Sequence, residues 1–331
     1  MEYSKSLSVL ERRGGHVETV HDVQALVMNG AGDIIDAWGD MMQSVCPRSS
    51  FKLIQALGLA EYQVTDRLDY LSLACASHNA EALHSETAAA WLNEMGLSED
   101  DLQCGGHWPI DRDAEHDLVR AGHKYNALHN NCSGKHTGML AFCQHQGWDL
   151  ETYLEPDHPL QIWIRERLSE FSEINANDMP MVTDGCSAPN YFMPMLNVGK
   201  VFSRFISGCD MSDARAKACQ LLMEAIAAYP KHIGGTNRFC TDIADISKGR
   251  LIGKAGALGS YILLAPKDDK IIYVKVGDGL GPAAPPAICH LLKKYGIWEE
   301  AWDAPLQKYH QPVIKNCREI ETGDMIVVMP A

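Results

Sequence analysis

Long apolar runs are absent from this chain of 331 residues. No stretch reaches the roughly 18 consecutive apolar residues that a membrane-spanning helix needs, so we expect no membrane segment and no membrane partner. The first residues, MEYSKSLSVLERRGG, also lack the apolar core of a secretory signal. These two absences predict a cytoplasmic protein.

Positive charge is scarce as well. The chain has 29 lysines and arginines against 43 aspartates and glutamates, which gives a formal net charge of −14. Proteins that bind nucleic acids or anionic lipid surfaces need basic patches to neutralise phosphate groups. The composition therefore argues against nucleic acid as a partner.

Paired cysteine motifs are also missing. The 11 cysteines are odd in number, and none forms a Cys-x-x-Cys pair. In a cytoplasmic protein, most of them are expected to be buried, reduced thiols that pack as small apolar residues. Two cysteines lie in a different sequence context, described below.

Strand signals occur at both ends of the chain and helix signals between them. The expected hairpins are 25–38, with a turn at 29–33, and 260–276, with a turn at 266–269; a last strand is expected near 325–329. Helical spacing marks 81–95, 160–171, 213–228 and 284–295. This order predicts an α+β fold whose antiparallel sheet is built from both termini, with helices packed on it. Without repeats or an obvious linker, residues 1–331 are expected to form one domain, with a mostly helical lobe in the middle.

Segment 47–52 reads PRSSFK and precedes apolar residues with helical spacing. Ser49 and Lys52 are three residues apart, so they share one face of a helix. A serine hydroxyl becomes an effective nucleophile when a base takes its proton, and a lysine can be that base if burial or a nearby cation lowers its pKa. Arg48 could be this cation or could bind a substrate carboxylate. Ser-x-x-Lys is also common at solvated helix starts, so the motif alone does not define a site.

Two further segments carry polar residues next to apolar ones. Segment 75–79 (CASHN) follows the apolar run 71–74, which could place Ser77 at the edge of a pocket; taken alone, the segment favours the alternative, the start of a helix. Segment 253–259 (GKAGALG) precedes a predicted strand, and Lys254 at a sheet edge can reach across a cleft. Acyl-transfer enzymes with Ser-x-x-Lys use a second lysine on such a strand. A glycine-rich turn with a solvated lysine is the alternative.

Segments 130–138 (NNCSGKHTG) and 183–190 (TDGCSAPN) are rich in Asn, Gly and Ser, which predicts loops. They contain Cys132 and Cys186, and a cysteine among small polar residues is more accessible than one in a core. If the two loops meet, usual zinc chemistry would combine both thiolates with His136. Two unrelated loop cysteines are the alternative.

Taken together and in this order, five segments resemble the class 3, or rhizobial-type, L-asparaginases. The segments are PRSSFKLIQAL, CASHNAE, HNNCSGKHTGM, TDGCSAPNY and GKAGALG. The fold of that family is similar to the serine β-lactamases and glutaminases. The resemblance runs from the first hairpin to the last strands and implies hydrolysis of L-asparagine to L-aspartate and ammonia, in a homodimer.

The resemblance also implies roles for particular residues. It suggests two Ser–Lys pairs as the catalytic groups, further residues that bind substrate, and a Zn²⁺ ion held by two cysteines and a lysine. By position the catalytic residues are Ser49, Lys52, Ser77 and Lys254, the substrate-binding residues are Arg48, His78 and Asp184, and the zinc ligands are Cys132, Lys135 and Cys186. A lysine ligand must be a neutral amine, because an ammonium group has no lone pair. His136 is the second candidate for that position.

The chain departs from the family pattern at two positions. Leu258 stands where the resemblance leads us to expect an acidic residue, and Cys240 stands where it leads us to expect an aspartate. Either change could alter substrate fit or metal chemistry. Three other functions fit parts of the pattern: another Ser-x-x-Lys acyl-transfer hydrolase, such as a glutaminase or a β-lactamase-like enzyme; a hydrolase that uses zinc-bound hydroxide; and a zinc or thiol sensor without catalysis.

Overall fold

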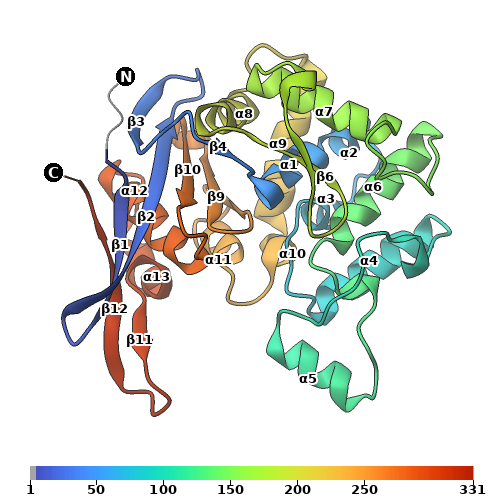
Figure 1. Ribbon diagram of the computed structural model, residues 1–331. Coiled ribbons are helices and arrows are strands. Elements are labelled where there is room, and N and C mark those ends of the chain that lie inside the picture. The colour runs from blue at the N-terminus through green and yellow to red at the C-terminus, as the bar shows by residue number, and fades with distance from the viewer. Residues whose placement is uncertain (1–4, 331) are drawn as a thin grey trace.

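The computed structural model describes residues 5–330 and is organised around one eight-stranded antiparallel sheet (Figure 1). The strands run in the order β11-β12-β1-β2-β10-β9-β8, and β3 pairs with β2 outside this path. Their bounds are β1 Leu7–Arg13, β2 His16–Met28, β3 Ile34–Trp38, β8 Ile252–Ala255, β9 Ser260–Ala265, β10 Lys270–Val276, β11 Val313–Lys315 and β12 Glu321–Val328. Because β1 pairs with both β2 and β12, segments from the two ends of the chain lie side by side. The expected α+β class, with its sheet built from both termini, is confirmed.

Both predicted hairpins are present. Strand β2 turns into β3 through residues 29–33, where the Asn29 side chain accepts a hydrogen bond from Asp33 N at 2.8 Å. Strand β9 turns into β10 through residues 266–269, where Asp269 adopts a left-handed φ of 51°. The two turns touch, because Gly30 N donates to Asp269 Oδ1 at 2.9 Å. Local turn chemistry thus fixes both hairpins, and their contact aligns them.

The helices occupy the middle of the chain and its C-terminal part. The predicted helices correspond to α4 Ala82–Glu94, α7 Pro159–Ser172, α9 Asp213–Ala228 and α12 Ala284–Lys294. The others are α1 Lys52–Gln55, α2 Leu57–Glu61, α3 Leu68–Ala74, α5 Arg112–Arg120, α6 Ser133–Gln146, α8 Met195–Ser207, α10 Pro230–Gly234, α11 Phe239–Ile246 and α13 Asp303–His310. Two small sheets pair β4 (Ser44–Val45) with β7 (Met193–Pro194) and β5 (Met181–Thr183) with β6 (Pro189–Tyr191).

The central strands of the main sheet are buried on both faces. Leu26 and Met28 on β2 face helix α8, and a side chain at Gly199 would place its Cβ only 2.4 Å from Met28 Sδ. Alternate residues on a strand point to opposite faces, and Ala25 and Val27 are also fully buried. Helix α12 contacts β1, β9, β10 and β12, and Figure 1 shows α12 and α13 beside these strands, with the other helices grouped on the opposite side.

The short helix η1 (Arg48–Phe51), which contains Ser49, lies directly against the end of β8. Ser50 Oγ donates to Lys254 O at 3.4 Å, and Gly256 lies so close that an added Cβ would be 2.3 Å from Pro47 O. No larger residue fits between them without a backbone shift. Strand β8 and η1 are therefore in direct contact, although they are about 200 residues apart in sequence.

Two sequence expectations need correction. Segment 130–138 is a loop only up to Cys132, because α6 begins at Ser133 and carries Lys135 and His136. Glycines in this segment predicted a loop, but in the structure glycine permits close packing between helices: a Cβ at Gly134 would lie 2.4 Å from Leu73 Cγ of α3. Lys254, expected in a glycine-rich segment before a strand, lies within β8, the last strand at one side of the sheet. Between residues 5 and 330, no helix has the length and apolarity required to cross a membrane.

Candidate functional site

A buried serine hydroxyl connects two buried lysines at the centre of the candidate site. Ser77 Oγ accepts hydrogen bonds from Lys254 Nζ at 2.8 Å and from Lys52 Nζ at 3.1 Å. The two lysines are each 1% exposed and Ser77 is 8% exposed. The three residues come from β8, from α1 and from the segment between α3 and α4. The structure therefore brings both expected Ser–Lys pairs into one region, with Ser77 as the point of contact.

Lys254 has a strongly altered pKa. Burial, together with the positive charge of Lys52 nearby, lowers the pKa of Lys254 to about 7. Its ammonium form donates to Ser77 and to Ala255 O at 2.7 Å. A lysine with this pKa can accept or release a proton near neutral pH.

Ser49 lies one turn before Lys52, at the junction of η1 and α1. Ser49 O accepts the hydrogen bond from Lys52 N, which places both residues on adjoining helical turns. The Ser49 side chain is half-buried, and its hydroxyl makes no hydrogen bond with the part of the chain that the structure describes. Lys52 Nζ instead contacts Ala76 O, Ser77 and Cys132. Ser49 is thus the more open of the two serines and Ser77 the more enclosed.

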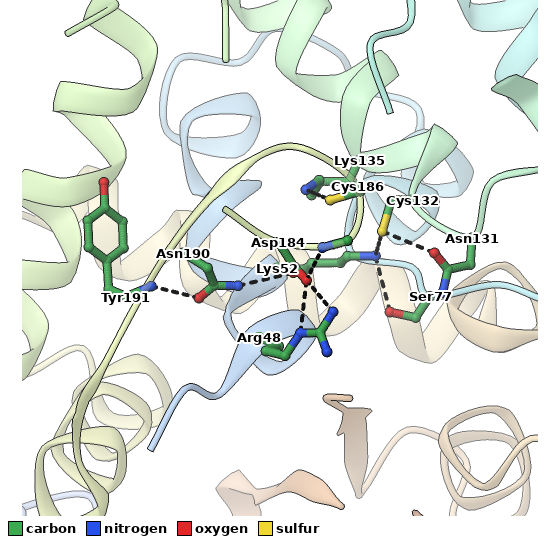
Figure 2. A network of polar contacts seen from close by, with 11 residues as sticks. Arg48, Lys52, Ser77, Asn131, Cys132, Lys135, Asp184, Cys186, Asn190 and Tyr191 are labelled. Atoms are coloured by element: carbon green, nitrogen blue, oxygen red, sulfur yellow. Dashed lines mark hydrogen bonds and ion pairs between the residues drawn. The ribbon is translucent and has the colours of Figure 1, made fainter. Parts of the chain in front are cut away.

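Arg48 and Asp184 are joined to each other in this structure. Arg48 Nε donates to Asp184 Oδ1 at 2.8 Å, and Arg48 Nη2 contacts the same oxygen (Figure 2). Asp184 Oδ2 accepts from Asn190 Nδ2 at 3.2 Å. The Asp184 side chain is 8% exposed and that of Arg48 is 29% exposed. Arg48 therefore retains an open edge, whereas the Asp184 carboxylate is enclosed by its partners.

The third substrate-binding candidate, His78, lies behind the site. It is fully buried, its Nε2 is 3.0 Å from Ser133 Oγ, and its Nδ1 accepts from Ala80 N at 3.1 Å. Burial lowers the pKa of His78 well below its ordinary value, and the stacked ring of His84 adds to this effect. His78 is a neutral ring that supports the start of α6, and these contacts leave neither ring nitrogen free.

The three expected zinc ligands converge beside Lys52. Lys135 Nζ lies 2.9 Å from Cys186 Sγ, and Lys52 Nζ lies 3.0 Å from Cys132 Sγ (Figure 2). Contrary to the expectation of accessible loop thiols, the two cysteines are only 5% and 4% exposed, because α6 and the 184–188 turn close over them. The hydrogen bond between the two sulfurs raises the pKa of Cys132 and lowers that of Cys186. Burial alone would lower the pKa of Lys135, but both sulfurs outweigh it and the pKa is raised.

The donor chemistry of this group suits zinc. The two cysteine sulfurs are usual ligands of Zn²⁺, and Lys135 could complete the set only as a neutral amine. His136 Nε2 is also buried and has no hydrogen-bond partner, while His136 Nδ1 lies 2.7 Å from Tyr153 OH. Across residues 5–330, no group of three or more His, Cys, Asp or Glu side chains could hold a metal, so a site here depends on Lys135.

The two departures from the family pattern have distinct structural positions. Cys240 Sγ accepts from Ala255 N at 3.2 Å and from Tyr261 OH at 3.4 Å, so it holds the end of β8 next to Lys254. Leu258, in the turn between β8 and β9, is 64% exposed and has a left-handed φ of 54°.

A cavity of about 450 Å³ lies near Cys240. It is lined by Cys240, by Ala255 of β8 and by further residues that include parts of α11, α12 and α13. Because Ser49, Lys52 and Ser77 do not line it, this cavity and the candidate site are separate features.

Sequence reasoning missed several neighbours of the site. The carbonyl of Ala76 accepts from Lys52, and the Asn131 side chain accepts from Cys132 Sγ at 3.2 Å. Beneath η1, the hydroxyls of Ser50, Ser260 and Tyr273 form a buried chain with separations of 3.4 and 3.0 Å. The positions of Asn131 and Ser50 inside the quoted motifs were a usable signal, whereas Tyr273 gave none.

This chain is similar to several solved structures at low sequence identity. A search of curated protein sequences gives no match. Similar solved structures include a β-lactamase from Mycobacterium bovis, at 14% identity over 87% of this chain and 95% of that chain, with a TM-score of 0.42. A penicillin-binding protein homologue from Pyrococcus abyssi matches at 11% identity over 82% and 73% of the two chains, with a TM-score of 0.42. A D-alanine carboxypeptidase from Burkholderia cenocepacia matches at 11% identity over 79% and 91%, with a TM-score of 0.37.

The family comparison covers nearly the whole molecule. Residues 9–327 match the family model described as L-asparaginase II. The matched region extends from β1 to β12 and contains all the candidate residues described above. The chain therefore belongs to the L-asparaginase II family and is an asparaginase-like hydrolase.

Proposed function

We propose that this protein is a class 3, rhizobial-type L-asparaginase that hydrolyses the side-chain amide of L-asparagine through an acyl-enzyme on Ser49. The observation that carries the proposal is the position of Ser77 Oγ between Lys52 Nζ and Lys254 Nζ. This chain of polar groups starts one helical turn from Ser49 and ends at an amine whose pKa is about 7. Family membership supports L-asparagine as the substrate.

The first half of the reaction forms the acyl-enzyme. Lys52 first passes a proton through Ser77 to the neutral amine of Lys254, and it then accepts the Ser49 proton as Ser49 Oγ attacks the amide carbon. Ser77 can relay a proton between Lys52 and Lys254, because its hydroxyl contacts both amines. The C–N bond then breaks, and the leaving nitrogen takes a proton from this chain and departs as ammonia. Backbone N–H groups near Ser49 would stabilise the oxyanion, and each such donor is typically worth about 3–4 kcal/mol.

The second half regenerates the enzyme. Water attacks the acyl carbon, the two lysines accept its proton, and the C–O bond to Ser49 breaks as a proton returns to Ser49 Oγ and L-aspartate is released. The chain of lysines and Ser77 therefore accepts and returns protons in turn, which the Lys254 pKa of about 7 permits. The uncommitted hydroxyl of Ser49 and its partial exposure suit it to the role of nucleophile.

Substrate binding needs partners for the α-carboxylate and the α-ammonium group. The open edge of the Arg48 guanidinium is the candidate for the carboxylate, since Nε and Nη2 are used by Asp184. We assign His78 to the wall beneath the site, because its ring nitrogens are occupied. When bound by Cys132, Lys135 and Cys186, zinc would hold α6 and the 184–188 turn together and offer a positive charge to a polar substrate group.

Other features of the proposal concern the protein as a whole. We propose that it is a cytoplasmic homodimer in which each chain forms one amidohydrolase domain. The free thiols of all 11 cysteines support the first part, because disulfides are rare in the reducing cytoplasm, and the family resemblance supports the second.

The deciding experiment combines an ammonia-release assay on L-asparagine and L-glutamine with a nitrocefin-hydrolysis assay for β-lactamase activity, each with and without a chelator. We expect turnover of asparagine with a kcat/KM about 100-fold above that of glutamine, because one added methylene displaces the amide carbon from Ser49. Comparable values for the two amides would indicate a glutaminase-like enzyme, and hydrolysis of the β-lactam would indicate the other acyl-transfer class. Zinc binding without release of ammonia from either amide would favour the alternative function, a zinc or thiol sensor without catalysis.

A further inference from the structure

The residue directly before the proposed nucleophile has an unfavourable backbone conformation. Arg48 has a φ of 52°, in the left-handed region that a residue with a Cβ adopts at a cost. Glycine takes this conformation readily, but an arginine needs surrounding contacts to hold it there. Ser49 follows immediately, so the direction of its side chain depends on the Arg48 backbone.

The contacts that hold Arg48 come from a distant turn. Asp184 Oδ1 accepts hydrogen bonds from Arg48 Nε at 2.8 Å and from Gly185 N at 2.6 Å, and it also contacts Arg48 Nη2. Asp184 Oδ2 accepts from Asn190, whose own Oδ1 accepts from Tyr191 N at 2.9 Å. Both oxygens of the Asp184 carboxylate therefore accept hydrogen bonds from groups other than the Arg48 guanidinium.

The turn that carries Asp184 is itself rigidly closed. Asp184 N donates to Ala188 O, and Ser187 N donates to Asp184 O, each at 2.9 Å. Between them, Cys186 Sγ contacts Lys135 Nζ on α6 at 2.9 Å. Figure 2 shows the resulting arrangement, in which the 184–188 turn touches Arg48 at one side and the Cys186–Lys135 contact at the other.

We infer that Asp184 is a positioning residue, which holds Arg48 in its left-handed conformation and thereby aims Ser49 at the substrate, rather than a residue that binds asparagine. The inference rests on the proposed role of Ser49. It explains why the Asp184 side chain is only 8% exposed and has both oxygens occupied. It also gives the 184–188 turn a direct contact with the residue that precedes the nucleophile.

The first test compares Asp184→Ala and Asp184→Asn in the full-length protein. If Asp184 positions Ser49, Asp184→Ala lowers kcat by about 100-fold while KM for asparagine changes little, the size typical of a misplaced reacting group. Asp184→Asn, which retains an oxygen for Arg48 Nε, keeps more of kcat than alanine does. A KM increase with unchanged kcat in both variants would identify Asp184 as a substrate ligand and overturn the inference. Zinc content and melting temperature are measured alongside.

The second test isolates the backbone conformation. Arg48→Gly and Arg48→Ala both remove the guanidinium, but only glycine takes the left-handed conformation without strain. We expect kcat of Arg48→Gly to exceed that of Arg48→Ala by about tenfold. Lys248 is the matched control, because it is exposed and has a φ of 52° outside the candidate site. Lys248→Gly and Lys248→Ala should share the same kcat. Equal kcat values for the two Arg48 variants would overturn the inference.

A third readout does not depend on asparagine as the substrate. A fluorophosphonate labels an activated serine by forming a bond from Oγ to phosphorus as fluoride leaves, and intact-mass and peptide analysis measure its rate at Ser49. The labelling rate should fall in Asp184→Ala and be higher in Arg48→Gly than in Arg48→Ala. If the wild-type protein is labelled in this pattern but releases no ammonia, the substrate proposal fails and the positioning role stands. Labelling rates that are equal in all these proteins, or no labelling of Ser49 in the wild type, would overturn the positioning role.

Discussion

At the scale of single residues, the division of labour between two serines is the main feature. Ser49 has an uncommitted hydroxyl at the junction of η1 and α1, whereas Ser77 is held between two amines. A nucleophile needs freedom to reach the substrate, and a proton relay needs fixed partners on both sides. The geometry therefore suits Ser49 to attack and Ser77 to relay.

Removing the nucleophile or its base should abolish turnover without unfolding the protein. We expect Ser49→Ala and Lys52→Ala each to lower kcat by about 10⁴-fold or more, because groups that act as a unit fail together. Ammonia release measures the loss, and circular dichroism confirms the fold. Ser44→Ala, at an exposed serine on β4, is the control and should be fully active. Near-normal kcat in Ser49→Ala would make Ser77 the nucleophile.

The pKa of Lys254 predicts how the rate depends on pH. Its pKa of about 7 lies well below the ordinary value for lysine because the side chain is buried and close to Lys52. The neutral amine is the form that accepts a proton, so kcat/KM should fall about tenfold per pH unit below 7 and level off above about pH 8. Lys254→Arg, which stays charged, should lose activity at every pH tested. A profile that is flat from pH 5.5 to 8.5 would contradict this role, and Lys248→Arg should leave the profile unchanged.

At the scale of elements, the site depends on how closely β8 approaches η1 and how closely α6 approaches α3. Glycines permit both approaches: Gly256 between β8 and η1, and Gly134 between α6 and α3. Close packing leaves no room for even a methyl group at such positions. The positions of Ser49 and Lys135 thus follow from contacts between backbones.

Gly256→Ala should damage both stability and activity. Its Cβ would lie 2.3 Å from Pro47 O, and a backbone oxygen cannot move aside as a flexible side chain can. We expect a loss of about 1–3 kcal/mol in the free energy of unfolding, with a fall in kcat as η1 is displaced. Gly281→Ala is the matched control, because nothing lies within 4 Å of its added Cβ. Chemical denaturation and ammonia release measure the two effects, and equal stability of the two variants would refute the argument.

The loop and helix that carry the two buried cysteines should bind one zinc per chain. The ligands must lose protons before they bind, so zinc affinity should fall as pH falls. Cys132→Ala and Cys186→Ala should lower zinc content and raise KM together, since Ser49 lies outside the ligand set. Elemental analysis of protein purified without chelator measures the metal, and Cys219→Ala, at a buried cysteine on α9, is the control. A metal-free preparation that is fully active and gains nothing from added zinc would contradict the prediction.

At the scale of the whole molecule, the proposed site residues depend on a sheet that is completed by the end of the chain. Strand β12 pairs with β1 along residues 8–13, although the last proposed site residue is Lys254. Truncation after Ile320 would remove β12 and leave β1 unpaired on one side, with Leu7 and Val9 losing cover. We expect this variant to be insoluble or unfolded, whereas truncation after Met329 should be tolerated. Solubility and circular dichroism test both, and a folded, active protein ending at Ile320 would refute the expectation.

The sequence by itself determined the features whose signals are local. Turn residues fixed both hairpins, apolar spacing located α4, α7, α9 and α12, and the strand signals at both ends predicted the α+β sheet. The five motifs pointed to the family that residues 9–327 match. These features were readable because each depends on neighbouring residues or on a short pattern.

Only the tertiary structure decided which groups touch. Ser77 and Lys254 are 177 residues apart and Arg48 and Asp184 are 136 apart, so no local pattern could reveal that one hydroxyl joins two lysines or that a carboxylate holds a strained arginine. The sequence predicted a loop where α6 begins at Ser133 for the same reason. The glycine after Ser133 is needed for close packing against Leu73 on another helix and does not mark a turn. The burial of Lys254 also depends on the tertiary structure, because segments distant in sequence surround its side chain. This burial is the main reason why its pKa is lowered to about 7.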